Sequence, residues 1–595
     1  MSKFSCVMLL CSLGVSSVAI ANDAAHEEPE VEIRQTQIAN FKPLTDADLK
    51  KPDPADWPMY RRNYEGWGFS PLDQVKTGNV KGLRMVWSRI LPAGWQQSTP
   101  IVHNGVIFIG SSKDVIQAID ANSGNLIWEY KHKLPKDMTS YNTLGQNKRS
   151  VALYGDKLYF LSWDNHVIAL DAKTGAKVWE TDRGDGEKGA SNTNGPIVVD
   201  GVVIAGTSCQ YAGIDCYVTG HDAATGKELW RNHLLPRKGE KGYDTWAGLP
   251  DDRRWATGSW GAITYDPELN LIYYGSNGAM PLSEAQRRTP GATMFGTNTR
   301  FAVRPRTGQT VWTHQVLPRD NWEQDCVFEM MPLTSAVNPD PKAEGMMAVG
   351  KVKGQTRKVL TGIPCKTGIA WTFDAKTGEF LWAKSTVQQN LIEAIDPKGQ
   401  VKINEAMILN SVDKKISQCP SYLGGKDWPT AAYNPRRNVI FEPLNNICSD
   451  TQPIPEEPTP EASYNVDFTW IPTPGKENRI GRIDAISVET GATVWSYEQQ
   501  AVLFSPVLAT AGDLLFTGGS DRTFRAINQA DGKVLWETRL PSQVTGHAVS
   551  YAVNGKQYIA VGTGGGLVSG YLQQTQPNID APVGANALFV FALED

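Results

Sequence analysis

Short hydrophobic stretches with alternating polar positions recur along this chain, and each is followed by a tight turn and a second stretch that ends in Trp. The alternation is typical of half-buried strands. The turn usually holds an acid, then Ser or Thr, then Gly, and these residues favour a turn in which side chains bond the backbone and Gly takes a positive φ. Each copy therefore predicts a strand, a turn and a second strand. Seven copies cover residues 118–128, 169–179, 220–230, 302–312, 372–382, 485–495 and 526–536, and an eighth, degenerate copy covers 80–87.

The spacing of these copies predicts the fold class. The Trp residues that end them are 41, 51, 51, 82, 70, 113 and 41 residues apart. Repeats of about 40 to 50 residues with four short strands in each are the mark of a β-propeller. We predict an all-β, eight-bladed β-propeller that forms one domain over residues 22–595, with insertions between Trp230 and Trp495. The repeated Trp residues are expected to lie against neighbouring blades as structural residues.

The N-terminus and the charge distribution bear on location and partners. An apolar run after Lys3 ends in Ala-Ile-Ala at residues 19–21 before a polar stretch, which is the pattern of a secretory signal peptide cleaved after Ala21. Residues 1–21 are therefore predicted to be removed on export to the periplasm. The net charge is −5 with dispersed Lys and Arg, which gives no sign of a nucleic-acid partner. No internal apolar run reaches the length of a membrane span.

Six cysteines remain after the signal peptide, and an even number in an exported protein predicts disulfides, although fifteen pairings are formally possible. Short separation favours one pair, a shared insertion favours the second, and the third follows by elimination. No CxxCH haem motif, paired CxxC or HExxH zinc motif is present. The expected pairs are Cys209 with Cys216, Cys419 with Cys448, and Cys326 with Cys365.

The long steps between repeats are the places to look for chemistry, because sites are usually built on loops that a rigid scaffold carries. The three steps longer than 51 residues lie between Trp230 and Trp495. Their polar and aromatic candidates are Trp260, Asn277 and the segments 320–326, 364–368 and 419–428.

Several of these segments resemble the quinoprotein alcohol dehydrogenases of the methanol and ethanol dehydrogenase family. The repeat itself is similar to the tryptophan-docking motif of that family, and the matching segments are 56–75, 260–276, 365–378, 419–428 and 505–527. Members use pyrroloquinoline quinone (PQQ) with a calcium or lanthanide ion in an eight-bladed propeller. The resemblance covers nearly the whole mature length, and it implies PQQ and Ca2+, or a lanthanide, for this chain.

The resemblance also implies which side chains bind the quinone. Arg149 stands at the place of an arginine that binds a quinone carboxylate, and Trp260 at the place of the indole beneath the quinone ring. Lys366 stands beside the reactive carbonyl, where its charge would favour a developing oxyanion. The complete implied set of cofactor contacts is Arg149, Thr193, Ser208, Trp260, Lys366 and Asp427.

Two acids carry the predicted catalysis and metal binding. The catalytic aspartate of the family falls on Glu323, and Asp325 stands where lanthanide-type members have an additional acid. Both are expected to face the site, because alternate residues of an extended segment point the same way. Either one is a candidate general base, with Asp325 preferred. Asn277, Glu323 and Asp325 are the predicted metal ligands, since a hard ion such as Ca2+ needs about 6 to 8 oxygens.

Three positions depart from the pattern of the family. Its vicinal cysteine pair falls on Thr143 and Leu144, its metal-binding glutamate on Tyr211, and its metal-binding asparagine on Gly278, one residue after Asn277. A phenol is mostly protonated at neutral pH, so Tyr211 is a poor replacement ligand. The usual metal shell is therefore expected to be partly missing.

These residues predict a periplasmic, PQQ-dependent alcohol dehydrogenase that transfers hydride to the quinone. The missing cysteine pair, and Leu503 at a position where the family often has Trp, favour an alcohol larger than methanol, secondary alcohols included. Because the chain has no haem motif, its electrons are expected to pass to a separate cytochrome c. Two alternatives remain: a quinoprotein that acts on a sugar or an aldehyde hydrate, and a propeller scaffold without catalysis.

Overall fold

The fold was examined in a computed structural model, which describes residues 33–34, 36–136, 138, 143–209, 213–256, 258–459, 464–566, 574–582 and 584–594. The predicted signal peptide, residues 1–21, lies outside the described residues, as does Tyr211. The described chain is all-β, with short helices only. These are α1 (Asp46–Lys50), α3 (Glu284–Arg287) and the 3-10 turns η1 (Val80–Gly82), η2 (Ser112–Asp114), η3 (Thr143–Gln146), η4 (Gly186–Lys188), η5 (Tyr243–Trp246), η6 (Asp251–Arg253) and η7 (Glu405–Met407).

Most strands belong to sheets with four main antiparallel strands each. The first four sheets are β4 (Ile101–His103), β5 (Val106–Ser111), β6 (Val115–Asp120) and β7 (Leu126–Lys131), with β1 (Ile33–Arg34) beside β7; β8 (Ala152–Tyr154), β9 (Lys157–Leu161), β10 (His166–Asp171) and β11 (Lys177–Asp182); β12 (Ile197–Val199), β13 (Val202–Ala205), β14 (Tyr217–Asp222) and β15 (Glu228–His233); and β17 (Thr264–Asp266), β18 (Leu271–Gly275), β20 (Thr299–Val303) and β21 (Thr310–Gln315).

Four more sheets of this kind follow along the chain. They are β22 (Met331–Val337), β24 (Gln355–Gly362), β25 (Ile369–Asp374) and β26 (Phe380–Ser385), with β23 (Met346–Val349) beside β26; β30 (Ala432–Asn434), β31 (Val439–Asn445), β34 (Gly481–Ser487) and β35 (Thr493–Gln499); β36 (Leu508–Thr510), β37 (Leu514–Gly518), β38 (Thr523–Asn528) and β39 (Val534–Arg539), with β2 (Phe69–Ser70) beside β36; and β40 (Val549–Val553), β41 (Lys556–Thr563) and β42 (Ala587–Leu593), with β3 (Leu83–Ile90) beside β42.

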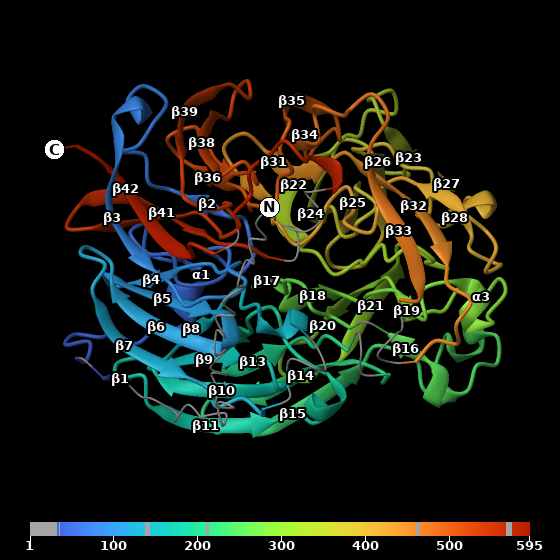
Figure 1. The fold of residues 1–595 in the computed structure, drawn as a ribbon, viewed down its shortest axis with the longest axis horizontal. Coiled ribbons are helices and arrows are strands. Elements are labelled where there is room, and N and C mark those ends of the chain that lie inside the picture. Colours follow the sequence, from blue (N-terminus) through green and yellow to red (C-terminus); the bar gives the residue numbers. More distant parts are fainter. Residues whose placement is uncertain are drawn as a thin grey trace, which may run out of the picture.

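Figure 1 shows these sheets following one another around the molecule in chain order, from blue to red. The early strand β3 pairs antiparallel with the late strand β42, from Leu83 opposite Leu593 to Ile90 opposite Ala587. The last sheet therefore unites the two ends of the described chain. The core lies between neighbouring sheets: one buried cluster joins Ile107 of β5, Phe516 of β37 and Val561 of β41.

The predicted turns form as expected and place Gly against Trp of the preceding repeat. In the turn between β10 and β11, Asp171 Oδ1 accepts hydrogen bonds from the backbone N–H and hydroxyl of Thr174, both at 2.8 Å. Gly175 follows with φ of 76°, and a Cβ atom there would lie 2.7 Å from Trp128. Trp128 also donates its indole N–H to the Ala172 carbonyl at 3.1 Å. Consecutive sheets are thus held together by an indole that packs on a glycine.

This contact recurs between other sheets. Trp87, Trp179, Trp230, Trp312, Trp382 and Trp495 lie against Gly124, Gly226, Gly308, Gly378, Gly491 and Gly532 in the same way. The indoles of Trp179, Trp230, Trp312 and Trp495 also donate to backbone carbonyls of the following repeat, those of Ala223, Pro305, Ala375 and Gln529.

The insertions form small sheets of their own, and disulfides brace the loops around them. The insertion strands are β16 (Trp255–Ala256) with β19 (Ala279–Met280), β27 (Ile392–Ile395) with β28 (Val401–Ile403), and β29 (Ile416–Gln418) with β32 (Ile447–Pro453) and β33 (Val466–Pro472).

All three expected cysteine pairs are confirmed as disulfides: Cys209–Cys216, Cys326–Cys365 and Cys419–Cys448.

Candidate active site

Lys366 lies between the two predicted acids. Its Nζ is 2.9 Å from Asp325 Oδ2 and 3.5 Å from Glu323 Oε2, and all three side chains are nearly inaccessible to solvent. The Lys366 backbone N–H donates to the Asp325 carbonyl at 3.1 Å. The disulfide Cys326–Cys365 joins the residues next to Asp325 and Lys366. The cation and the acid are therefore fixed to each other by their backbone as well as by their charges.

The segment that carries the two acids is a turn and not the extended segment expected from the sequence, so the predicted reason for their convergence was wrong. Asp320 builds the turn: its carboxylate accepts hydrogen bonds from the backbone N–H groups of Trp322 and Gln324. Glu323 takes the left-handed conformation with φ of 54°. A residue with a side chain seldom adopts this region, and such strain clusters at functional sites. The hydroxyl of Tyr464 donates to Glu323 Oε1.

Burial governs the charge state of the cluster. It raises the pKa of Asp325 well above its usual value, an effect that the charge of Lys366 opposes and that of Glu323 reinforces. Burial likewise raises the pKa of Glu323, against the effects of Lys366 and of the Tyr464 hydroxyl. Burial alone would favour neutral Lys366, but the two carboxylates hold its pKa above the usual range. One ammonium group faces two buried carboxylates, so the cluster is suited to accept a proton or a further cation.

Arg149 forms the second half of the site. Its guanidinium donates to Gln97 Oε1 at 3.0 Å and to the Thr193 hydroxyl at 2.8 Å. It lies 4.9 Å from the ring centre of Trp260 and 5.4 Å from that of Trp428. Arg149, Trp260 and Trp428 line a small cavity, which is also lined by Tyr60, Asn194, Phe328, Glu329 and Thr430. A fixed cation beside flat indole faces suits a planar anion that carries carboxylates.

Asp427 connects the two halves. Its Oδ1 accepts the Trp428 backbone N–H at 2.7 Å. Burial raises the pKa of Asp427, and the charges of both Lys366 and Arg149 lower it. Gly425, two residues before, donates its N–H to the Lys366 carbonyl at 2.7 Å. Asp427 is therefore within the electrostatic reach of both cations.

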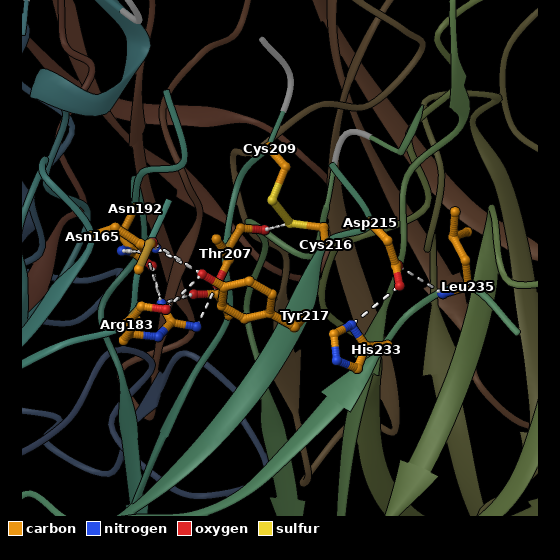
Figure 2. Close-up of a disulfide and its surroundings, with 12 residues drawn as sticks. Asn165, Arg183, Asn192, Thr207, Cys209, Asp215, Cys216, Tyr217, His233 and Leu235 are labelled. Atoms are coloured by element: carbon orange, nitrogen blue, oxygen red, sulfur yellow. Dashed lines mark hydrogen bonds and ion pairs between the residues drawn. A yellow bond between two sulfur atoms is a disulfide. The ribbon is translucent and has the colours of Figure 1, made fainter. Parts of the chain in front are cut away.

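A buried arginine, Arg183, binds the chain neighbours of Thr193 and Ser208, which are Asn192 and Thr207. Figure 2 shows Arg183 among Asn165, Asn192 and Thr207, close to the Cys209–Cys216 disulfide. Arg183 donates to Asn192 Oδ1 at 3.1 Å and also to the Thr207 hydroxyl. Ser208 itself pairs through its backbone with Ser191 and is bridged to Gly258. The backbones that present Thr193 and Ser208 are therefore fixed.

Two buried oxygens of the predicted metal ligands accept no hydrogen bond from the described residues: Asn277 Oδ1 and Asp325 Oδ1. Their segments are adjacent, because a Cβ atom on Gly275 would lie 1.9 Å from the carbonyl oxygen of Cys326. Amide and carboxylate oxygens are donors that Ca2+ and similar hard ions prefer. Buried oxygens without donors fit a cation, so the residues present are compatible with one.

The sequence missed several contacts and misjudged one. Gln97 and Tyr464 were not predicted, since each joins the site across at least 52 residues of chain with no local motif. Trp428 lies in the candidate segment 419–428, but its contact with Arg149 was not predicted. Leu503 lies in a buried cluster with Phe441, Ile483, Val507 and Leu515. Among the described residues, Val502 and Phe504 instead join the cluster of Trp260 and Trp428. Thr143 and Leu144 begin η3.

Comparison with known proteins identifies the family that this chain resembles. Residues 57–401 and 477–559 match the family model for the glucose, ethanol and alcohol dehydrogenase β-propeller domain that is named for PQQ. The quinohemoprotein alcohol dehydrogenase of Comamonas testosteroni is 30% identical over 539 residues, which cover 87% of this chain and 73% of that protein.

Two further matches cover a larger share of the matched protein. The lanthanide-dependent methanol dehydrogenase of Methylorubrum extorquens is 28% identical, over 88% of this chain and 90% of that protein. The solved structure of a europium-containing methanol dehydrogenase superposes with a TM-score of 0.82 at 25% identity and covers 92% of this chain and 99% of the other. No helix in the described part of this chain has both the length and the apolar character that a membrane span requires.

Proposed function

This chain belongs to the family of PQQ-dependent glucose, ethanol and alcohol dehydrogenases, and we propose that it oxidises an alcohol to an aldehyde or ketone in the periplasm. The observation that carries the proposal is the buried contact of Lys366 with Asp325 and Glu323, joined through Asp427 to Arg149 and its indole neighbours. A scaffold protein would have no use for so many buried charges, because each costs desolvation energy.

The residues that would hold the quinone are those of the Arg149 half. Arg149 and the hydroxyls of Thr193 and Ser208 offer donors to its carboxylates, and Trp260 offers a flat apolar surface. When bound, the quinone would supply the hydride acceptor for the alcohol, and a metal ion would supply a Lewis acid. The charge of Lys366 would stabilise an oxyanion that develops beside it.

Asp325 is the proposed general base. It takes the hydroxyl proton of the alcohol while the carbinol carbon loses hydride, so that two electrons and two protons leave the substrate in total. Its raised pKa makes it a better proton acceptor than an exposed aspartate. Glu323 and Asn277 would bind Ca2+ or a lanthanide ion together with Asp325.

The substrate is proposed to be larger than methanol, secondary alcohols included, because no vicinal cysteine pair stands at Thr143 and Leu144. Leu503 does not bear on the size of the substrate, because its side chain packs in a buried cluster with Phe441 and Val507. The electrons are proposed to pass to a separate cytochrome c, because the chain has no CxxCH motif.

The eight sheets of four main strands are inferred to be the blades of one propeller domain, which begins after a signal peptide of residues 1–21. Their order in the chain and the contacts between Trp and Gly of successive repeats support this inference.

Reconstitution of the purified chain with PQQ and either Ca2+ or La3+ tests the proposal. Dye reduction is screened with primary, secondary and polyol alcohols, with glucose and with aldehydes, and reduction of cytochrome c is followed separately. We expect alcohol-dependent reduction that Asp325→Asn abolishes. If the chain oxidises only glucose or aldehydes, its substrate belongs to a different class. If it does not bind PQQ, the alternative of a propeller scaffold without catalysis is favoured.

A further inference from the structure

A second cluster of metal-binding side chains lies away from the candidate active site. His132 follows β7 of the first sheet, whereas Asp164 and His166 lie at the turn into β10 of the second. One donor atom from each of the three lies within 4.8 Å of the others, and among the described residues this is the single group of three or more such side chains. His132 and Asp164 are buried, and His166 is partly exposed.

The orientation of both imidazoles suits a metal ion. His132 Nε2 lies 3.1 Å from Asp164 Oδ2, while its Nδ1 faces the Tyr130 hydroxyl at 3.5 Å. His166 Nδ1 lies 2.5 Å from Glu180 Oε1, which leaves its Nε2 on the other side of the ring. A histidine that binds a metal usually gives its second nitrogen to a carboxylate or another polar group. Both rings have such a partner.

The backbone around the cluster is held in place. Ser162 donates to Asp164 Oδ1 and accepts the His166 backbone N–H at 2.9 Å. On the other side, the His132 N–H donates to the Asp114 carbonyl, and Asp114 Oδ2 accepts the Trp163 N–H at 2.6 Å. The two loops are therefore tied together through Asp114.

The charges of the cluster favour a divalent cation. Asp164, Glu180 and Asp182 surround the two imidazoles, and Asp182 Oδ1 lies 3.6 Å from His166 Nε2. Two lysines lie nearby and are already paired with carboxylates: Lys177 with Glu180 at 2.8 Å, and Lys148 with Asp114 at 2.8 Å.

We propose that His132, Asp164 and His166 bind a divalent transition-metal ion of the Zn2+ class, which links the first two sheets. Two imidazole nitrogens and one carboxylate oxygen are a donor set that suits Zn2+ and disfavours Ca2+, which prefers oxygen ligands alone. Three protein ligands leave the fourth position to water or to Asp182. The ion would stabilise the folded chain because it binds the folded state and joins two sheets.

Zn2+ binding to the full chain tests this site in buffer with excess Ca2+, which saturates oxygen-rich sites, the candidate active site included. Equilibrium dialysis with metal analysis gives affinity and stoichiometry, and Co2+ in place of Zn2+ reports nitrogen ligands through its visible absorption. We expect one Zn2+ per chain, at least tenfold weaker binding in His166→Ala, and a melting temperature that rises with Zn2+ in the parent protein alone.

Two further variants separate a ligand role from a structural one. Glu180→Gln, which keeps the shape but removes the charge behind His166, should weaken Zn2+ binding by about 10- to 100-fold. His233→Ala is the matched control, because His233 also pairs with a carboxylate, that of Asp215 at 3.1 Å (Figure 2), but lies outside the three-residue cluster. The proposal is overturned if the parent chain retains no Zn2+ at micromolar free metal, or if His166→Ala binds it as the parent does.

Discussion

Two carboxylates, that of buried Asp325 and that of partly buried Glu323, share one ammonium group at the candidate active site, and their different surroundings underlie the different roles proposed for them. Asp325 is fixed by the Lys366 backbone and has one oxygen without a donor among the described residues. Glu323 has a strained backbone and a bond from the Tyr464 hydroxyl. These surroundings favour the proposal that Asp325 takes the substrate proton in addition to contacting the ion, whereas Glu323 acts as a ligand of the ion alone.

Substitution of each acid tests these roles. Asp325→Asn removes the base and should lower turnover by about 10²- to 10⁴-fold at every metal concentration. Glu323→Gln should mainly raise the metal concentration needed for activity, because it removes a charged oxygen from the ion. Titration of both variants with Ca2+ and La3+ measures this. The assignment is reversed if added metal rescues Asp325→Asn while Glu323→Gln stays inactive throughout.

Lys366 should control both turnover and its pH dependence. Lys366→Met removes the charge beside the oxyanion, so turnover should fall about 10²-fold or more. Activity needs ionised Asp325 and is lost as the pH falls through the pKa of that group. Burial raises this pKa and Lys366 lowers it, so the variant should lose activity at a higher pH than the parent. The measurement is kcat/KM against pH. If activity falls at the same acidic pH in the variant as in the parent, Lys366 does not control the pKa of Asp325. Thermal unfolding of both proteins shows whether any loss of activity comes from misfolding.

Individual residues of the site were predictable to different degrees. Lys366 and Asp325 could be found because each lies in a short segment with a distinct motif next to a cysteine. Tyr464 and Gln97 could not, because their partners are 141 and 52 residues away and nothing in the local sequence marks the contact. The left-handed Glu323 was also hidden, since the bonds of Asp320 that produce it depend on the tertiary arrangement.

At the scale of elements, turn chemistry made the strands predictable. The acid, Thr and Gly of each repeat form the expected turn, and Trp packs on the Gly of the next repeat. The small sheets of the insertions were not predicted, because β29 pairs with β32 across up to 35 residues, Ile416 opposite Thr451, and β32 pairs with β33 without a repeated pattern. Pairing between distant short strands is set by packing, and intrinsic strand preference is weak by comparison.

Gly175→Ala tests the contact between neighbouring sheets. The new methyl group would lie 2.7 Å from Trp128, so crowding of about 1 to 3 kcal/mol should add to the cost of a positive φ, about 1 to 2 kcal/mol. Gly155→Ala is the matched control, since Gly155 has a similar φ of 60° and no atom within 4 Å of the added carbon. Urea unfolding should show the larger loss for Gly175→Ala. Equal losses would mean that the Trp128 contact adds nothing beyond the backbone conformation.

At the scale of the whole molecule, the repeats alone do not determine how the ends meet. The degenerate copy at 80–87 predicted a strand, and the structure pairs that strand, β3, with β42 near the other end of the chain. A pairing over about 500 residues cannot be inferred from local periodicity, because it depends on the summed rotation of all the intervening sheets. It also means that the last sheet cannot be completed until nearly the whole chain is present.

Truncation before β42 tests whether this pairing holds the molecule together. A chain that stops after Gly584 lacks β42, so β3 and β41 would both become unpaired edges, and the buried partners of Leu588, Val590 and Phe591 would be exposed. Open edges and exposed apolar surface promote aggregation. We expect this chain to be insoluble or to unfold at a much lower temperature, and to bind no PQQ even though its candidate site residues are all retained. A chain that stops after Leu593 keeps β42 and serves as the control. If the shorter chain melts as the control does and binds PQQ equally well, closure through β3 and β42 is dispensable.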